Sequence, residues 1–294
     1  MCKKNIFFLL LLFFLLVRNV SGADAIIGGE TVYVVKKGDT LERIGAKFGV
    51  NWKNVARKNN IDLKKFLRIG QKLKINNRKI VPLVLKEGIV INIPDRMLYF
   101  FKKGKPEMVF PVGLGMPSWN GMTRWRTPVG KFKVTQKAKN PTWYVPESIQ
   151  QKMKMQGDEI KIAVPPGKEN PLGRYAVKTT FHGILIHETI YPASVYQFRS
   201  HGCIRVLPEH MENFFERIKI NAQGEIIYRP VKVAVSEKGR VFLEAHKDVY
   251  ERIGDLRTEA KKMIKEKKLL HKVNWQKVEK VVNEKSGVAE DVSL

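Results

Sequence analysis

The chain is organised around residues 200–205, SHGCIR, a short segment that carries a cysteine between two strand-like stretches. The sequence has 2 cysteines, and the other one is Cys2. A solitary cysteine with histidines nearby is typical of a nucleophile, because a thiol needs a base or a cation to lose its proton near neutral pH. His187 follows an apolar run sixteen positions before Cys203 and is the first candidate for that base.

The neighbours of the cysteine offer further chemistry. Gly202 permits a turn and lets backbone N–H groups approach a substrate, which suits an oxyanion hole. His201 lies two residues before Cys203, and Arg205 adds a positive charge that favours a thiolate or binds a substrate carboxylate. These residue types in one window favour a catalytic site.

Two other interpretations of this window stay open at this point. One is a zinc site formed by His182, His187, His201 and Cys203, although the sequence contains no CxxC pair and no HExxH, and structural zinc sites usually have more sulfur ligands. The other is a structural role, in which Cys203 is an inert core thiol and the histidines cap turns.

The N-terminus has the order of a secretory signal. Lys3 and Lys4 precede an apolar run at residues 6–17, and Ser21-Gly22-Ala23 supplies a small-x-small cleavage site. We expect residues 1–23 to be removed, since the apolar run is short for a membrane anchor, which is the alternative. The mature protein would then keep one cysteine, and an unpaired cysteine in an exported protein is a liability unless it is used.

The charge of the chain indicates an anionic partner. Its 294 residues include 54 Lys and Arg against 28 Asp and Glu, a net charge of +26. Nucleic acid, anionic lipid and an acidic wall polymer all suit this charge. Export argues against nucleic acid, and no basic motif is interleaved with base-stacking aromatic residues.

Residues 31–77 predict a small βααβ unit. A strand-like run at 31–35 leads into a Lys-Gly-Asp-Thr turn, and two short helical patterns begin at Leu41 and Trp52. The segments VKKGDTLERIGAKFGV (35–50), NVARKNNI (54–61) and LRIGQKLKI (67–75) resemble a LysM domain over almost the whole unit. This resemblance implies binding of N-acetylglucosamine-containing glycan, usually peptidoglycan. It places the sugar in a groove lined by Gly38, Asp39, Thr40, Asn60 and Ile61.

Residues 88–246 predict a mainly β domain, a sandwich or a barrel. Short apolar runs separated by turn residues recur along this region, for example at 89–93, 97–101, 131–134 and 184–186. Helices are expected at 149–155 and 208–218, and a closing hairpin turns at 236–239.

The C-terminal region predicts a helical extension at residues 247–285 and a loose tail at 286–294. Val249, Ile253, Leu256 and Ala260 follow helical spacing, and Asn274 is placed to cap a second helix.

The region from Gly88 to Ala245 resembles an L,D-transpeptidase catalytic domain of the YkuD-like family. The resemblance rests on TPVGKFKV (127–134), NPTWYVP (140–146), VPPGKENPLGRYAV (164–177), IHET (186–189) and SHGCIRVLPEHMENFF (200–215). It is strongest with the periplasmic Gram-negative branch, some of whose members also carry a LysM domain. It implies an exported cell-wall enzyme that needs no metal and no organic cofactor.

The resemblance also implies roles for individual residues. Cys203 would be the nucleophile and His187 the general base, because their separation matches the family. His182 is followed by glycine, as the family's histidine usually is, but it lies twenty-one residues before Cys203 and ranks second. The family usually has Gly or Ser after its histidine, and this chain has Glu188. The Glu188 carbonyl can still orient the imidazole, and its carboxylate could add a second orienting hydrogen bond.

In the same family pattern, His201 helps to shape an oxyanion hole with the backbone N–H groups of Gly202 and Cys203. Ser200 would hold the turn, and Arg205 would engage the substrate or order the loop.

The implied reaction is acyl transfer on peptidoglycan. Cys203 would attack the bond before the terminal D-Ala of a tetrapeptide stem, form a thioester and pass the acyl group to an amine. That amine belongs to another stem, which gives a 3→3 cross-link, or to a lysine of an outer-membrane lipoprotein. Two alternatives stay open: a thiol hydrolase on the same scaffold, and a wall-binding protein without catalysis.

Overall fold

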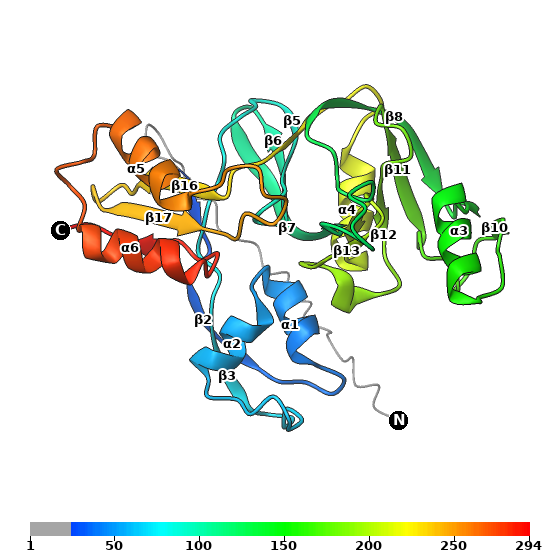
Figure 1. Cartoon of the computed structure of the whole chain (residues 1–294), viewed down its shortest axis with the longest axis horizontal. Coiled ribbons are helices and arrows are strands. Elements are labelled where there is room, and N and C mark those ends of the chain that lie inside the picture. Colours follow the sequence, from blue (N-terminus) through cyan, green and yellow to red (C-terminus); the bar gives the residue numbers. More distant parts are fainter. Residues whose placement is uncertain (1–24) are drawn as a thin grey trace, which may run out of the picture.

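The computed structural model describes residues 25–294, so the predicted signal at 1–23 lies outside the described residues. Among these described residues, no helix has the length and apolar character needed to cross a membrane. Figure 1 shows three packed units: a small one at the bottom, a large β unit at the centre and right, and a smaller mixed unit at the left.

The small unit has the predicted βααβ order. Its elements are β2 (Glu30–Val34), α1 (Leu41–Phe48), α2 (Trp52–Lys58) and β3 (Lys72–Asn76), and β2 pairs antiparallel with β3. The Thr40 side chain accepts a hydrogen bond from the Arg43 N–H and so caps α1. Gly49 ends α1 in the left-handed region, at a φ of 63°. The local turn chemistry therefore sets the bounds of α1.

The large unit is a barrel-like sheet, which confirms the predicted mainly β fold. Its strands run in the order β13-β7-β14-β12-β11-β8-β15-β5-β6, and β6 also pairs with β7. This last pairing closes eight of the strands into a ring, with β13 attached outside. The strands are β5 (Gly88–Asn92), β6 (Met97–Lys102), β7 (Lys105–Gly115), β8 (Gly130–Lys139), β11 (Tyr175–Thr179), β12 (Leu185–Glu188), β13 (Phe198–Ser200), β14 (Ile204–Val206) and β15 (Gln223–Ile227).

Side chains alternate between the two faces of the sheet, so each face contributes to a different core. In β5, Ile89 and Ile91 join the main core, while Val90 lies in a second cluster with Tyr99. Helix α4 (Pro208–Arg217) packs against the main core with Met211, Phe214 and Phe215. Both faces of β5 are therefore covered, which explains why its sequence is almost entirely apolar.

An arm projects from the barrel at the right of Figure 1. It consists of β9 (Trp143–Tyr144), α3 (Glu147–Gln156) and β10 (Ala163–Val164), and β9 pairs with β10. The helix expected at 149–155 is present as α3, but none of its side chains is buried. The Lys152 ammonium, in the middle of α3, lies 5.7 Å from the Trp119 ring and 5.5 Å from the Trp125 ring.

The third unit combines a three-stranded sheet with two helices. Its elements are β16 (Val231–Val235), β17 (Val241–Ala245), α5 (Leu256–Glu266), α6 (Trp275–Glu284) and β18 (Glu290–Asp291). Val233, Leu243, Ile264 and Val282 share one core. The predicted hairpin at 236–239 forms, but it belongs to this unit and not to the barrel, because its apolar faces pack against α5 and α6.

One detail of this C-terminal unit differs from expectation and another agrees with it. Residues 247–255 form a loop and not the start of a helix, since the Asp248 carboxylate accepts hydrogen bonds from the N–H groups of Arg252, Ile253 and Gly254. The expected cap at Asn274 is confirmed, because its side chain accepts from the Gln276 and Lys277 N–H groups.

The tail also differs from the loose segment that the sequence predicts. In the structure β18 pairs with β17, and Ala289 and Val292 are fully buried. The side chain of Asn54, on α2, donates to the Ser286 carbonyl at 3.0 Å. The tail is ordered because the hairpin offers it a free edge and an apolar surface, which local sequence does not reveal.

A buried ion-pair network joins the barrel to the C-terminal unit, and we call Asp95, Lys232, Glu244 and His246 the interunit network. The Lys232 ammonium lies 2.7 Å from an Asp95 oxygen and 3.0 Å from a Glu244 oxygen. His246 Nε2 lies 2.6 Å from Glu244, and the Ile80 N–H donates to the other Glu244 oxygen at 2.6 Å. Asp95, Glu244 and His246 have a spacing that could suit a metal ion. The Lys232 ammonium between the two carboxylates already supplies their positive partner.

Candidate active site

The loop that carries Cys203 connects β13 to β14 and is fixed by its own hydrogen bonds. The Ser200 hydroxyl donates to the Cys203 carbonyl at 2.6 Å, and the Gly202 N–H donates to the Ser200 oxygen at 3.2 Å. Gly202 has a φ of 107°, and a Cβ there would lie 2.8 Å from the Cδ1 of Ile184. The backbone conformation requires glycine at this position, whereas the Ile184 methyl could shift.

This arrangement limits the predicted oxyanion hole. The family resemblance implies that the N–H groups of Gly202 and Cys203 form it, but the Gly202 N–H is directed to Ser200. In this structure the Cys203 N–H is the remaining candidate of the two. The Gly202 N–H already has an acceptor in the Ser200 hydroxyl, and the oxyanion hole itself stays a prediction.

Thr127 and Tyr250 support the loop from behind, and sequence reasoning missed both. The Thr127 hydroxyl donates to the Gly202 carbonyl at 2.9 Å and accepts from the Gly115 N–H at 2.9 Å. The Tyr250 hydroxyl donates to the Gly115 carbonyl at 2.6 Å. Thr127 is the first residue of the TPVG motif, so the motif could have indicated that Thr127 has a role near Cys203.

The Cys203 thiol is half-buried and faces the segment that leads into β12. The Leu185 N–H donates to Sγ at 3.4 Å, and the thiol donates to the Gly183 carbonyl at 3.4 Å. Burial raises the pKa of Cys203, while the Leu185 N–H and the Arg205 charge act in the opposite direction. The resting cysteine is therefore a neutral thiol.

His187 lies on β12, the strand that pairs in parallel with β14. The register sets Ile186 opposite Ile204 and His187 opposite Arg205. Leu185 and His187 face the same side of the sheet, because side chains alternate along a strand. The Leu185 N–H contacts Sγ at 3.4 Å, which places the thiol beside a residue two positions before His187 on the same strand.

The protonation state of His187 follows from its surroundings. Its Nδ1 lies 2.6 Å from the Glu188 carbonyl oxygen, and a carbonyl can only accept. Nδ1 therefore carries the hydrogen and Nε2 keeps the lone pair of a base. Burial lowers the pKa of His187 to about 4, so the ring is neutral at physiological pH.

Glu188 keeps one of its two expected roles. Its carbonyl orients the His187 ring, and its backbone is extended, as part of β12. Its carboxylate does not reach His187, because adjacent residues of a strand point to opposite faces. The carboxylate lies 3.3 Å from the Arg174 Nε instead, and within residues 25–294 its Oε2 has no hydrogen-bond partner.

His201 belongs to an aromatic cluster beside the loop. Its ring packs edge-on against Trp125 at 4.3 Å, and Trp125 packs against Trp119 at 4.8 Å. The Lys152 ammonium of α3 lies 5.5 Å from the Trp125 ring. Burial lowers the pKa of His201 to about 4, helped by the charges of Lys152 and Arg205. Its Nε2 is buried and, among the described residues, has no partner.

The four residues of the zinc alternative do not converge. His182 is exposed, whereas His187 is 4% exposed. In the described part of the chain, the group with metal-ligand spacing is Asp95, Glu244 and His246, which contains none of these four. The structure therefore gives the zinc interpretation no support.

Most of the residues predicted to line the glycan groove make contacts within the βααβ unit itself. The Asp39 carboxylate accepts from the Tyr33 hydroxyl and from the Lys36 N–H, both at 2.7 Å. Thr40 caps α1, and Ile61 packs against the core of the unit. Gly38 and Asn60 both have positive φ, at 84° and 50°. These loops have defined shapes before any ligand is bound.

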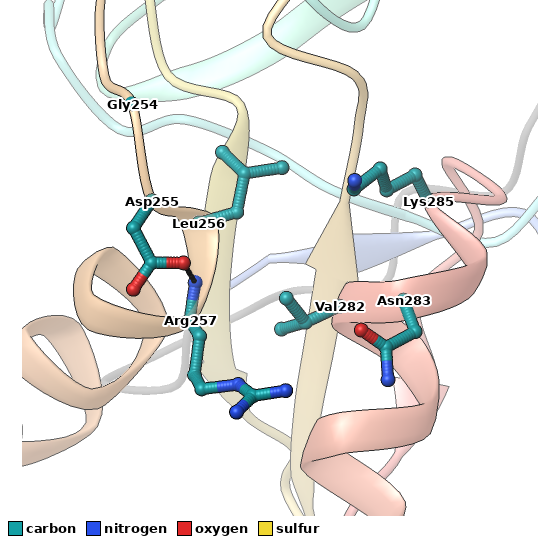
Figure 2. A pocket seen from close by; sticks show the side chains of 7 residues that line it. All are labelled: Gly254, Asp255, Leu256, Arg257, Val282, Asn283 and Lys285. Atoms are coloured by element: carbon teal, nitrogen blue, oxygen red, sulfur yellow. Dashed lines mark hydrogen bonds between the residues drawn. The ribbon is translucent and has the colours of Figure 1, made fainter.

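Two hollows lie away from Cys203. One, of about 210 Å³, lies between the start of α5 and the end of α6, where Asp255 caps α5 by accepting from the Arg257 N–H (Figure 2). The other, of about 230 Å³, lies between the βααβ unit and the C-terminal segment, from Asn54 to Glu290. Neither contains a residue predicted to be catalytic.

The fold and this geometry define a barrel protein with a cysteine in the loop before β14 and a neutral histidine on β12, the strand that pairs with β14. Comparison with known families makes the class specific. Residues 86–235 match the L,D-transpeptidase catalytic domain, and residues 33–76 match the LysM domain. The chain belongs to the L,D-transpeptidase family and is an enzyme of that type that acts on peptidoglycan.

Individual relatives agree with this assignment. The probable L,D-transpeptidase YcfS of Escherichia coli K12 is 30% identical over 234 residues, which cover 78% of this chain and 72% of the relative. The probable L,D-transpeptidase ErfK/SrfK of Salmonella typhimurium is 26% identical over 281 residues, covering 91% and 88%. Among solved structures, the catalytic domain of the E. faecium L,D-transpeptidase aligns over 49% of this chain and 98% of its own, with 17% identity and a TM-score of 0.34.

Proposed function

We propose that the chain is an exported L,D-transpeptidase that uses Cys203 as its nucleophile and works in the periplasm. The observation that carries the mechanism is the Nδ1 contact of His187 with the Glu188 carbonyl at 2.6 Å. This contact fixes a tautomer whose Nε2 accepts a proton. Membership of the family supports peptidoglycan as the substrate.

The first step is attack of the Cys203 sulfur on the carbonyl before the terminal D-Ala of a tetrapeptide stem. Because the thiol and His187 are both neutral at rest, proton transfer from Sγ to Nε2 accompanies the attack. The C–N bond breaks, the proton passes from His187 to the leaving amine, and D-Ala departs. The product is a thioester between Cys203 and the shortened stem.

The second step transfers the acyl group to an amine. The amine loses a proton to Nε2 as it attacks the thioester, and the Cys203 thiol is regenerated. The acceptor is the side-chain amine of a second stem, which gives a 3→3 cross-link, or a lysine of an outer-membrane lipoprotein. Arg205 is half-buried on β14 beside the thiol, and its charge can engage a stem carboxylate.

Intact-mass measurement tests this proposal. The purified enzyme with tetrapeptide muropeptides should gain the mass of the whole muropeptide minus one D-Ala, and Cys203→Ala should gain nothing. The control for folding is the melting temperature of Cys203→Ala, which we expect to stay near that of the parent. An equal adduct on both proteins would refute a thioester at Cys203.

Adding a lysine-bearing acceptor peptide separates transfer from hydrolysis. The proposal predicts an amide-linked product and a faster turnover of the adduct. Release of only the free tripeptide acid, with acceptor present, would show a thiol hydrolase instead. The same reaction with a second muropeptide as acceptor reports cross-linking.

A further inference from the structure

The loop between α2 and β3 exposes large apolar side chains that the proposed reaction does not use. Phe66 is 100% exposed, Ile69 is 70% exposed and Leu63 is 58% exposed. We call residues 62–70 the apolar loop. In Figure 1 the loop beside β3 lies at the bottom of the molecule, away from the barrel. Clustered apolar side chains on a protein surface usually mark a site of interaction.

The exposure is imposed by the way the loop is held. The Ile61 N–H donates to the Ala56 carbonyl at one end, and the Gly70 N–H donates to the Val35 carbonyl at the other, both at 2.9 Å. Between them, Leu67 packs against the core of the unit. With both ends and Leu67 fixed, the three exposed side chains are directed outward.

Cations surround these apolar side chains. Lys64, Lys65 and Arg68 lie within the loop and are exposed, and Lys72 follows on β3. Asp62 is the one acid in this stretch, and its carboxylate accepts a hydrogen bond from the Lys64 N–H at 3.0 Å. Among residues 25–294, no ion pair engages any of these four cations.

This combination fits one kind of partner better than others. Apolar side chains that enter the headgroup region, flanked by Lys and Arg at the level of the phosphates, are typical of peripheral membrane contacts. An acidic glycan would satisfy the cations, and a sugar face could stack on Phe66. It would leave Leu63 and Ile69 in water, because it offers no apolar phase.

We propose that the apolar loop is a peripheral docking surface for an anionic lipid bilayer, into which Leu63, Phe66 and Ile69 insert. This goes beyond the proposed function and does not depend on it. The sequence predicts membrane contact only through an uncleaved signal. The apolar loop would add a reversible contact, with the barrel held on the opposite side of the βααβ unit.

Vesicle co-sedimentation tests the proposal. The chain that begins at Asp24 is used, because the apolar run at 6–17 would bind vesicles by itself. The core clusters of the described residues begin at Ala25. Phosphatidylcholine vesicles are compared with vesicles that also contain phosphatidylglycerol. We expect at least about tenfold tighter binding to the anionic vesicles, with a loss in high salt.

Three variants assign the binding to the loop. Leu63→Ser with Phe66→Ser should weaken binding to anionic vesicles by at least about tenfold, because each residue loses apolar burial. Lys64→Gln with Lys65→Gln should weaken it by about fivefold per lysine removed. The control is Ile220→Ser, a 56% exposed apolar residue outside the βααβ unit, which should bind like the parent.

Two results would overturn the proposal. One is equal vesicle binding by the parent and the Leu63→Ser, Phe66→Ser variant, with melting temperatures showing that both are folded. The other is loss of binding to purified sacculi in that variant with vesicle binding unchanged, which would make the apolar loop a sugar platform. Unchanged sacculus binding together with lost vesicle binding supports the bilayer.

Discussion

The interunit network and the Cys203 site both contain buried titratable groups, but the groups of the network are paired, whereas a buried nitrogen near Cys203 is not. In the network, Lys232 contacts Asp95 and Glu244, and Glu244 also contacts His246 and a backbone N–H. Near Cys203, the His201 Nε2 is buried without a partner in the described residues. Buried polar atoms usually have partners. The network is complete and stabilises the architecture, whereas the site keeps hydrogen-bonding capacity that a substrate can fill.

The largest effect is expected from removing the base. His187→Gln should lower the rate of thioester formation by about 10²–10⁴-fold, because the thiol then loses its proton acceptor. The rate of D-Ala release measures this. The matched control is His182→Gln, since His182 is exposed and five positions earlier. A slower reaction in His182→Gln than in His187→Gln would exchange the roles of the two histidines.

Breaking the interunit network should affect stability and not chemistry. Lys232→Met leaves the buried Asp95 carboxylate without its cation and leaves Glu244 with the more distant Lys79 ammonium, at 3.9 Å. Removing one partner of a buried ion pair typically costs about 3–5 kcal/mol in the free energy of unfolding. Denaturant unfolding measures this loss.

The control for this prediction is Lys58→Met, which breaks the exposed pair with Glu30 and should cost less than about 1 kcal/mol. At a temperature where the variants are folded, thioester formation should match the parent. A specific loss of activity in folded Lys232→Met would instead connect the network to catalysis.

The smallest effect concerns pH. Burial lowers the pKa of His187 and of His201 to about 4, whereas an unfolded chain protonates both near the ordinary value of 6.5. Between these values the unfolded state binds more protons, so the free energy of unfolding falls as the pH drops from about 6.5 to about 4. Thioester formation should likewise lose its base only as the pH approaches about 4.

Measuring initial rates and denaturant midpoints across this range tests both statements. An acidic limb centred near the ordinary histidine pKa would show that the base is solvated, against the burial of His187. A midpoint that does not change with pH would contradict buried neutral histidines.

Features that depend only on local sequence were predicted well. The βααβ order, the mainly β fold and the Asn274 cap follow from short patterns whose physics is local. The turn around Gly202 could also be expected, since the glycine is recognisable in the sequence. The hydrogen bond from the Gly202 N–H to Ser200 could not be expected, because it depends on the rotamer of the Ser200 side chain.

Features that depend on distant parts of the chain were missed. Asp95 and Lys232 are 137 positions apart, and neither has a local pattern that marks it as buried. The tail was expected to be loose because nine residues by themselves show no partner, and only the free edge of β17 gives them one. The Glu188 carboxylate was expected beside His187, although strand alternation, once β12 is placed, directs it away.

The C-terminal segment also has a mechanical consequence. Lys79, in the connector after the βααβ unit, donates to the Gly287 carbonyl and to the Tyr196 hydroxyl, while Ala46 of α1 packs against Val195 and Leu207. These contacts hold the βααβ unit against the barrel, so the two units are not joined by the connector alone. If a sugar strand occupies that unit, Cys203 is presented at a set offset from it. The enzyme would then react with stems at a fixed distance along the glycan strand from the sugar that the βααβ unit holds.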